Sequence, residues 1–92
     1  MNALDDYVIE SLMADLVGHD HKPSAFLVYL MIAAIGPASL SYAELAERTG
    51  LSKRAVQMAL AHLKARQLIE VRKGGVTEAA RYVALTPWRR TE

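Results

Sequence analysis

The 92-residue sequence predicts a mainly α-helical domain with a small β-hairpin near its C-terminal end. Two observations lead to this fold class. Apolar residues recur at helical spacing through the first two thirds of the chain, and two short segments of alternating apolar and polar residues follow. The stretch from Ser41 to Arg66 is typical of a helix-turn-helix, because it contains a short helix, a glycine turn and a longer helix.

Two apolar helices are expected before this motif. A four-residue apolar repeat predicts a helix from Met1 to Val17 and consists of Leu4, Val8, Leu12 and Leu16. The segment from Gly18 to Pro23 breaks it, and Pro23 suits the first turn of a second helix, from Ser24 to about Ile35. The second helix is apolar nearly all round and must be covered on most sides. Gly36-Pro37 ends it, and residues 38–40 are expected to add a short strand.

The motif itself has recognisable ends. Ser41 and Glu44 form a capping box that closes the free amides of the first helix. Gly50 ends that helix in the left-handed conformation, which costs other residues free energy. Ser52 then caps the second helix. The inward positions of the second helix are Val56, Leu60 and Leu63.

A hairpin is expected directly after the second helix of the motif. Leu68 to Arg72 alternates as a half-buried strand does, and Arg81 to Leu85 is interpreted as the returning strand. The loop between them is basic and contains Gly74-Gly75. Two such strands after a recognition helix form a wing. A basic tail follows, and its Trp88 is expected to pack against the hairpin or the N-terminal helix from Met1 to Val17.

Composition narrows the class of protein. There are no cysteines, which excludes disulfides and thiolate metal sites. Hydrophobic residues make up 52% of the chain, a surplus that predicts burial of some apolar surface against a second copy. The longest apolar run, Ala25 to Ile35, is too short for a bilayer, which needs about 20 residues. The N-terminus carries Asp5-Asp6 in place of the basic start of a signal peptide, so we expect a cytoplasmic protein that does not enter a membrane.

The charge is divided along the chain. The formal net charge is +1, but residues 1–40 carry one Lys and five acidic residues, a net charge of −4. Residues 41–92 carry ten basic and five acidic residues, a net charge of +5. A basic half beside an acidic half indicates a polyanionic partner on one side of the molecule.

Together these residues resemble the winged helix-turn-helix DNA-binding domains of bacterial transcription regulators of the MarR and GntR types. The resemblance covers about residues 24–86 and is carried by Leu45-Ala46, Gly50-Leu51-Ser52, Val56, Leu60, residues 63–69 and Gly74-Gly75. It implies a three-helix core with a wing, to which this chain adds an N-terminal helix over residues 1–18 and a basic tail over residues 87–92. All of 1–92 is then one domain. It also implies a homodimer, formed through the N-terminal and second helices, that binds double-stranded DNA.

The resemblance places the second helix of the motif in the major groove. Its outward residues would be Ser52, Lys53, Arg54, Gln57, Ala61 and Lys64. Arginine pairs with guanine and glutamine with adenine through two hydrogen bonds, so Arg54 and Gln57 are expected to read bases. The other expected DNA contacts are Tyr42, Ser52, Lys53, Lys64, Arg72 and Lys73. Met58 and Ala61 give this face less charge than the resemblance implies.

Other functions are weighed against DNA binding. A winged-helix module that docks a protein through Met58, Ala61 and the second helix stays open, as does a plasmid or phage replication or partition component. An effector pocket around Phe26 and Tyr29 is interpreted as core, so no small-molecule ligand is assigned. No cofactor, metal or enzymatic activity is expected: residues 19–21, His-Asp-His, are interpreted as a solvated turn, and no nucleophile elbow or phosphate-binding glycine loop is present.

Overall fold

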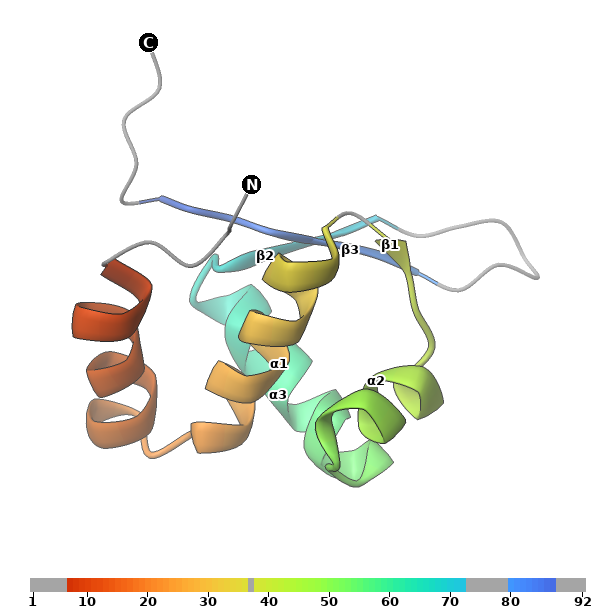
Figure 1. Cartoon of the computed structure of the whole chain (residues 1–92), viewed down its shortest axis with the longest axis horizontal. Coiled ribbons are helices and arrows are strands. Elements are labelled where there is room, and N and C mark those ends of the chain that lie inside the picture. The colour runs from red at the N-terminus through yellow and green to blue at the C-terminus, as the bar shows by residue number, and fades with distance from the viewer. Residues whose placement is uncertain (1–6, 37, 73–79, 88–92) are drawn as a thin grey trace, which may run out of the picture.

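In the computed structural model, which describes residues 7–36, 38–72 and 80–87, helices pack against one face of a small antiparallel sheet (Figure 1). The elements in chain order are η1 (Val8–Leu12), η2 (Ala14–His19), α1 (Pro23–Ile35), β1 (Ala38–Ser39), α2 (Tyr42–Thr49), α3 (Lys53–Ala65), β2 (Ile69–Arg72) and β3 (Arg81–Ala84). The predicted fold class, a mainly helical domain with a C-terminal hairpin, is confirmed.

The N-terminal helix differs from its prediction in its hydrogen bonding. Over η1 and η2 the turns are those of a π-helix, in which each bond spans five residues. The helix also runs to His19, two residues beyond the predicted end at Val17. The described members of its four-residue repeat, Val8, Leu12 and Leu16, are all buried, as expected for the inward face of this helix.

Helix α1 runs through the centre of the fold and contacts η2, α2, α3 and β3. Its buried residues are Ala25, Phe26, Val28, Tyr29 and Ile32. The Tyr29 hydroxyl donates a hydrogen bond of 2.8 Å to the carbonyl of Leu85, which ties the helix to the end of the hairpin. The cover expected around this helix is therefore present, and the aromatic cluster at Phe26 and Tyr29 is core.

The helix-turn-helix has the ends that its sequence predicts. Ser41 accepts a bond from the Glu44 amide, and the Glu44 carboxylate accepts one from the Ser41 amide, which completes the capping box. These bonds also lower the pKa of Glu44. Gly50 closes α2 with a left-handed φ of 80°. The Ser52 hydroxyl accepts the amide of Ala55 and caps α3.

The turn from α3 into β2 is a Schellman motif. The amide of Leu68 bonds the carbonyl of Leu63, and the amide of Gln67 bonds that of Lys64. Gln67 occupies the left-handed position with φ of 60°. Leu63 and Leu68 are both buried, which supplies the apolar contact that accompanies this motif. The turn fixes the direction in which the hairpin leaves the recognition helix.

The described strands form one antiparallel sheet in the order β1-β3-β2, in which the expected strand at residues 38–40 pairs with β3 as β1. Val71 is opposite Tyr82, and Arg72 is opposite Arg81. Tyr82 is buried and Val71 is half-buried, whereas both arginines are exposed. One face of the hairpin therefore packs on the helices and the other carries basic side chains.

Several predictions fall outside the described residues: those for Leu4, Lys73, the Gly74-Gly75 loop and Trp88. Within the described ranges, no helix is long and apolar enough to cross a membrane.

A matched pair of glycine substitutions tests the turn between α2 and α3. Gly50→Ala is expected to lower the free energy of unfolding by about 1 kcal/mol, because a Cβ disfavours left-handed backbone. A Cβ there would meet nothing within 4 Å, so the cost comes from the backbone alone. Gly18→Ala has equal space but lies within η2, and we expect it to raise the free energy of unfolding by about 0.5 kcal/mol.

Urea denaturation of both variants measures the two changes. Equal stability of Gly50→Ala and the unmodified protein would contradict the left-handed assignment at Gly50.

Candidate nucleic-acid interface

Helix α3 has one buried, apolar side and one solvent-exposed side. Val56, Leu60 and Leu63 are buried, as predicted. The exposed residues along the helix include Lys53, Arg54, Gln57, Met58, Ala61 and Lys64. All the side chains of α3 that were predicted to contact DNA are therefore accessible to solvent.

The N-terminal end of α3 favours an anion. The first turn contains no acidic side chain, while Lys53 and Arg54 occupy its first two positions. Unpaired amides at a helix start carry partial positive charge, which these two cations reinforce. The Ser52 oxygen accepts the Ala55 amide at 3.0 Å, so that hydroxyl serves the helix cap. Its proton is still able to donate to a phosphate oxygen.

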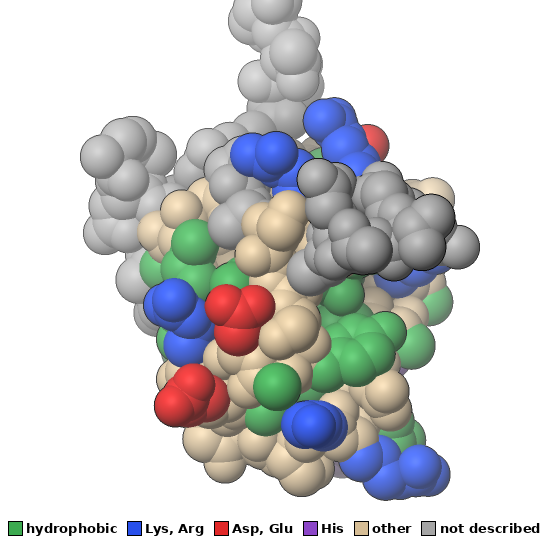
Figure 2. Space-filling model, turned by 90° about the vertical axis from the view of Figure 1, so that its right-hand side faces the viewer, with side chains coloured by type: hydrophobic (Ala, Val, Ile, Leu, Met, Phe, Trp, Pro, Cys, Tyr) green, Lys and Arg blue, Asp and Glu red, His purple; other side chains and the backbone are tan. Residues whose placement is uncertain are grey.

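A hollow of about 290 Å³ lies between α2, α3 and the hairpin. It is lined by Tyr42, Gln57, Leu60, Ala61, Lys64, Val71, Ala80 and Tyr82. Figure 2 shows one face of the molecule, on which hydrophobic side chains gather and both Lys or Arg and Asp or Glu side chains lie around them. The hollow brings together three of the predicted contact residues, Tyr42, Gln57 and Lys64, from two helices.

The hairpin supplies a pair of arginines that the sequence indicated only in part. Arg72 was predicted, and it lies directly opposite Arg81, which was not. Arg72 also forms an exposed ion pair with Glu70, with an Nε–Oε2 distance of 3.2 Å. Like charges directly opposite across strands are destabilising, so an anion bound between them would be favourable. Arg81 could be identified only from the register of the hairpin, that is, from knowing which residue of β3 lies opposite Arg72.

The carboxylate of Asp20 links the N-terminal helix to the end of α3. The Asp20 side chain is only 8% exposed, and its Oδ2 accepts a hydrogen bond of 2.8 Å from Nε2 of His62. Arg66 bonds both Asp20 and Asp15, the latter at 2.6 Å. His19 adds a bond of 2.9 Å to the other oxygen of Asp20. The solvated turn predicted at residues 19–21 is therefore wrong for Asp20, and His62 is partly buried beside it.

This cluster, Asp15, His19, Asp20, His62 and Arg66, lowers the pKa of its central carboxyl. The hydrogen bond from His19 and then that from His62 hold the pKa of Asp20 at about 2, below its ordinary 3.8, with a further contribution from the Arg66 charge. Burial acts in the opposite direction. The bond to Asp15 raises the pKa of Arg66 in turn. The charged forms of both partners are favoured by their contact.

The same cluster has the composition of a metal site. Ligand atoms of Asp15, His19 and Asp20 lie within 4.8 Å of one another. The guanidinium of Arg66 bonds both carboxylates, so it occupies the position that a cation would take and supplies its charge. The geometry is that of an ion-pair network that joins two helices.

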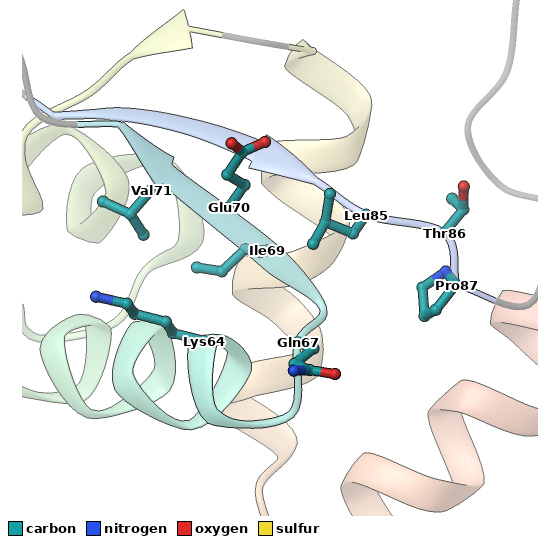
Figure 3. Close-up of a pocket in the computed structure, with 8 residues that line it drawn as sticks. All are labelled: Lys64, Gln67, Ile69, Glu70, Val71, Leu85, Thr86 and Pro87. Carbon is teal, nitrogen blue, oxygen red and sulfur yellow. The ribbon is translucent and has the colours of Figure 1, made fainter.

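A second hollow, of about 710 Å³, lies at the other end of α3 (Figure 3). Lys64 and Gln67 line it from the helix side, and Ile69 and Val71 point toward the helix from β2. Glu70 points to the opposite side of the strand. This hollow is therefore separate from the N-terminal half of α3, where the predicted base-reading residues lie.

Comparison with known proteins supports one family. The family model described as MarR family matches residues 19–76, which span the second predicted helix, the helix-turn-helix and the first strand of the hairpin. No significant match was found among curated proteins or among solved structures. The residues before His19 lie outside the matched region.

The charge network generates a prediction for Asp20→Asn. Because the pKa of Asp20 is lower in the folded than in the unfolded chain, its contribution to stability is complete above about pH 4 and is lost as the pH falls toward 2. We expect the variant to lose about 1 kcal/mol of unfolding free energy at pH 7, a modest value because Arg66 and Asp15 are about one third exposed and solvent screens them.

Urea titrations between pH 2 and pH 7 measure this dependence. The difference between the unmodified protein and Asp20→Asn should shrink over the acid window. Glu47→Gln removes an exposed carboxyl and should change the free energy of unfolding by less than about 0.5 kcal/mol. A difference that is constant from pH 2 to pH 7 would contradict the assigned role of Asp20.

Proposed function

The chain belongs to the MarR family of DNA-binding transcription regulators, and from this premise we propose that it binds a specific double-stranded DNA site as a dimer. Helix α3 enters the major groove, and the hairpin lies on the sugar–phosphate backbone. The observation that carries the proposal is the exposure of Lys53, Arg54 and Gln57 at the start of α3. Residues near the start of a recognition helix are those that reach base edges.

Two side chains are proposed to read bases. Arg54 and Gln57 are three residues apart, which places them as neighbours on one side of the helix. Both are exposed, and within the described residues no ion pair or hydrogen bond commits either of them. Arg54 would bind O6 and N7 of guanine, and Gln57 would bind N6 and N7 of adenine.

Phosphate contacts are proposed on both sides of the reading helix. Lys53 and the Ser52 hydroxyl lie at its start, and Tyr42 lies across the hollow at the start of α2. Lys64 lies farther along α3, where it lines both hollows. Arg72 lies on β2, and Lys73 follows it in the sequence. These contacts fix the position of the protein on the duplex without selecting its sequence.

A dimer is proposed because one copy makes few phosphate contacts, and two copies double them and read two half-sites about 34–36 Å apart. Apolar side chains remain exposed on the N-terminal helix and on α1 in the single chain. They are Tyr7, Val17, Leu27 and Ile35, each between 37% and 45% exposed. Burial of these side chains against a second copy would account for the apolar surplus of the sequence.

DNA binding is tested with two variants at the start of α3. In fluorescence titrations on genomic fragments, Arg54→Ala should lose its preference for the best fragment by about tenfold, because one base contact is removed. Lys53→Ala should weaken all fragments about equally and reduce the slope of log K against log salt by about 1.

Both variants change exposed side chains, so their folding should be unaffected, and circular dichroism checks this. The proposal would be overturned if the unmodified protein bound no duplex in a salt-dependent manner at 50 mM salt.

The dimer has a test of its own. Leu27 is 45% exposed on α1, so Leu27→Glu should leave the fold intact but place a charge in the proposed interface. Sedimentation should show at least a tenfold weaker dimer. Met58→Glu introduces the same charge at an exposed apolar position of α3 and should leave the dimer unchanged. A monomer in the unmodified protein at tens of micromolar would contradict the proposal.

A further inference from the structure

Two apolar residues lie in the middle of the open side of α3. Met58 is 54% exposed, the highest fraction among the large hydrophobic side chains that the structure describes. Ala61 is also exposed and lines the hollow beside the hairpin. Met58 is one turn from Arg54, and Ala61 is one turn from Gln57, so each apolar residue neighbours a proposed base reader.

Core packing does not explain the apolar character of Met58. Among the described residues the core of α3 is made by Val56, Ala59, Leu60 and Leu63, and Met58 does not pack against it. An exposed methionine loses little by replacement with a polar residue of equal helix propensity. Met58 and Ala61 lie on the same side of α3 as Arg54 and Gln57, so their apolar character belongs to the proposed reading face.

We propose that Met58 and Ala61 contact the C5-methyl groups of thymine in the major groove. The thymine methyl is the apolar group that base pairs present there, and alanine is among the side chains that recognise it. The inference rests on the proposed DNA binding and names what the recognition helix reads. Arg54 reads guanine near the helix start, Gln57 reads adenine, and the two apolar residues read thymines beside that adenine.

Charge favours DNA over a protein as the occupant of this apolar surface. Cations lie on α3 toward both of its ends, with Lys53 and Arg54 at the start and Lys64 farther along, and α3 carries no acidic side chain. A duplex has the complementary arrangement, because the methyl groups lie inside the groove and the phosphates form its two edges. The apolar residues would thus face the thymine methyl groups, and the neighbouring cations would face the phosphates.

Replacement of thymine by deoxyuridine tests the inference, because it removes only the methyl group. The best duplex is first selected from a random pool with the unmodified full-length protein. Each thymine is then replaced singly, and the dissociation constant is measured by fluorescence anisotropy. We expect about a fourfold loss of affinity at one or two thymines in each half-site, next to the adenine whose replacement is most harmful to binding.

A variant cycle assigns the loss to the two residues. Met58→Gln and Ala61→Ser should bind thymine and deoxyuridine duplexes with nearly equal affinity at those positions. Ala34→Ser, an exposed alanine on α1, should retain the full difference.

The possible failures are distinct. Salt-dependent, sequence-selective binding that no deoxyuridine replacement changes by as much as twofold would overturn the methyl contact and leave DNA binding intact. No salt-dependent binding to any duplex would overturn both proposals. Capture of a protein partner that Met58→Gln abolishes, together with absent duplex binding, would assign the surface to protein docking and overturn the inference as well.

Discussion

The whole arrangement depends on the enclosure of α1. This helix is apolar on nearly every side, and exposing it would cost about 1.5 to 3 kcal/mol for each large side chain. The N-terminal helix, α2, α3 and β3 must therefore pack around it, and each does. The Tyr29 hydroxyl meets the Leu85 carbonyl, which fixes the hairpin relative to the helices. The reading helix and the wing are positioned because both cover the same central helix.

Local chemistry made most of the fold predictable. The Ser41 and Ser52 caps, the left-handed Gly50 and the breaks at Pro23 and Gly36 each act over a few residues, and all lie where the sequence placed them. The inward face of α3 followed from the same kind of local spacing. Predictions of this kind succeed because the interaction that decides the structure is contained within one turn of the chain.

What escaped prediction depends on residues far apart in sequence. Asp20 and Arg66 are 46 positions apart, and only the tertiary fold, in which η2 and α3 both pack against α1, brings them together. The pairing of Arg72 with Arg81 requires the strand register. The π-helical turns also escaped prediction, because an apolar repeat indicates a helix without fixing its hydrogen-bond pattern. The exposure of the outward residues of α3 had no such dependence, since the spacing of the buried positions within that one helix was enough to predict it.

The partly exposed ion-pair network at Asp20 also restricts how this sequence can evolve. Loss of Arg66 alone would leave a nearly buried carboxylate with only histidine partners, and loss of Asp20 would leave Arg66 with Asp15 alone. Single substitutions are therefore disfavoured, while a joint replacement by apolar residues of similar volume would be tolerated. Among related chains we expect positions 15, 20, 62 and 66 to change together. Sequence changes in the N-terminal helix are thus expected to accompany changes at the end of α3.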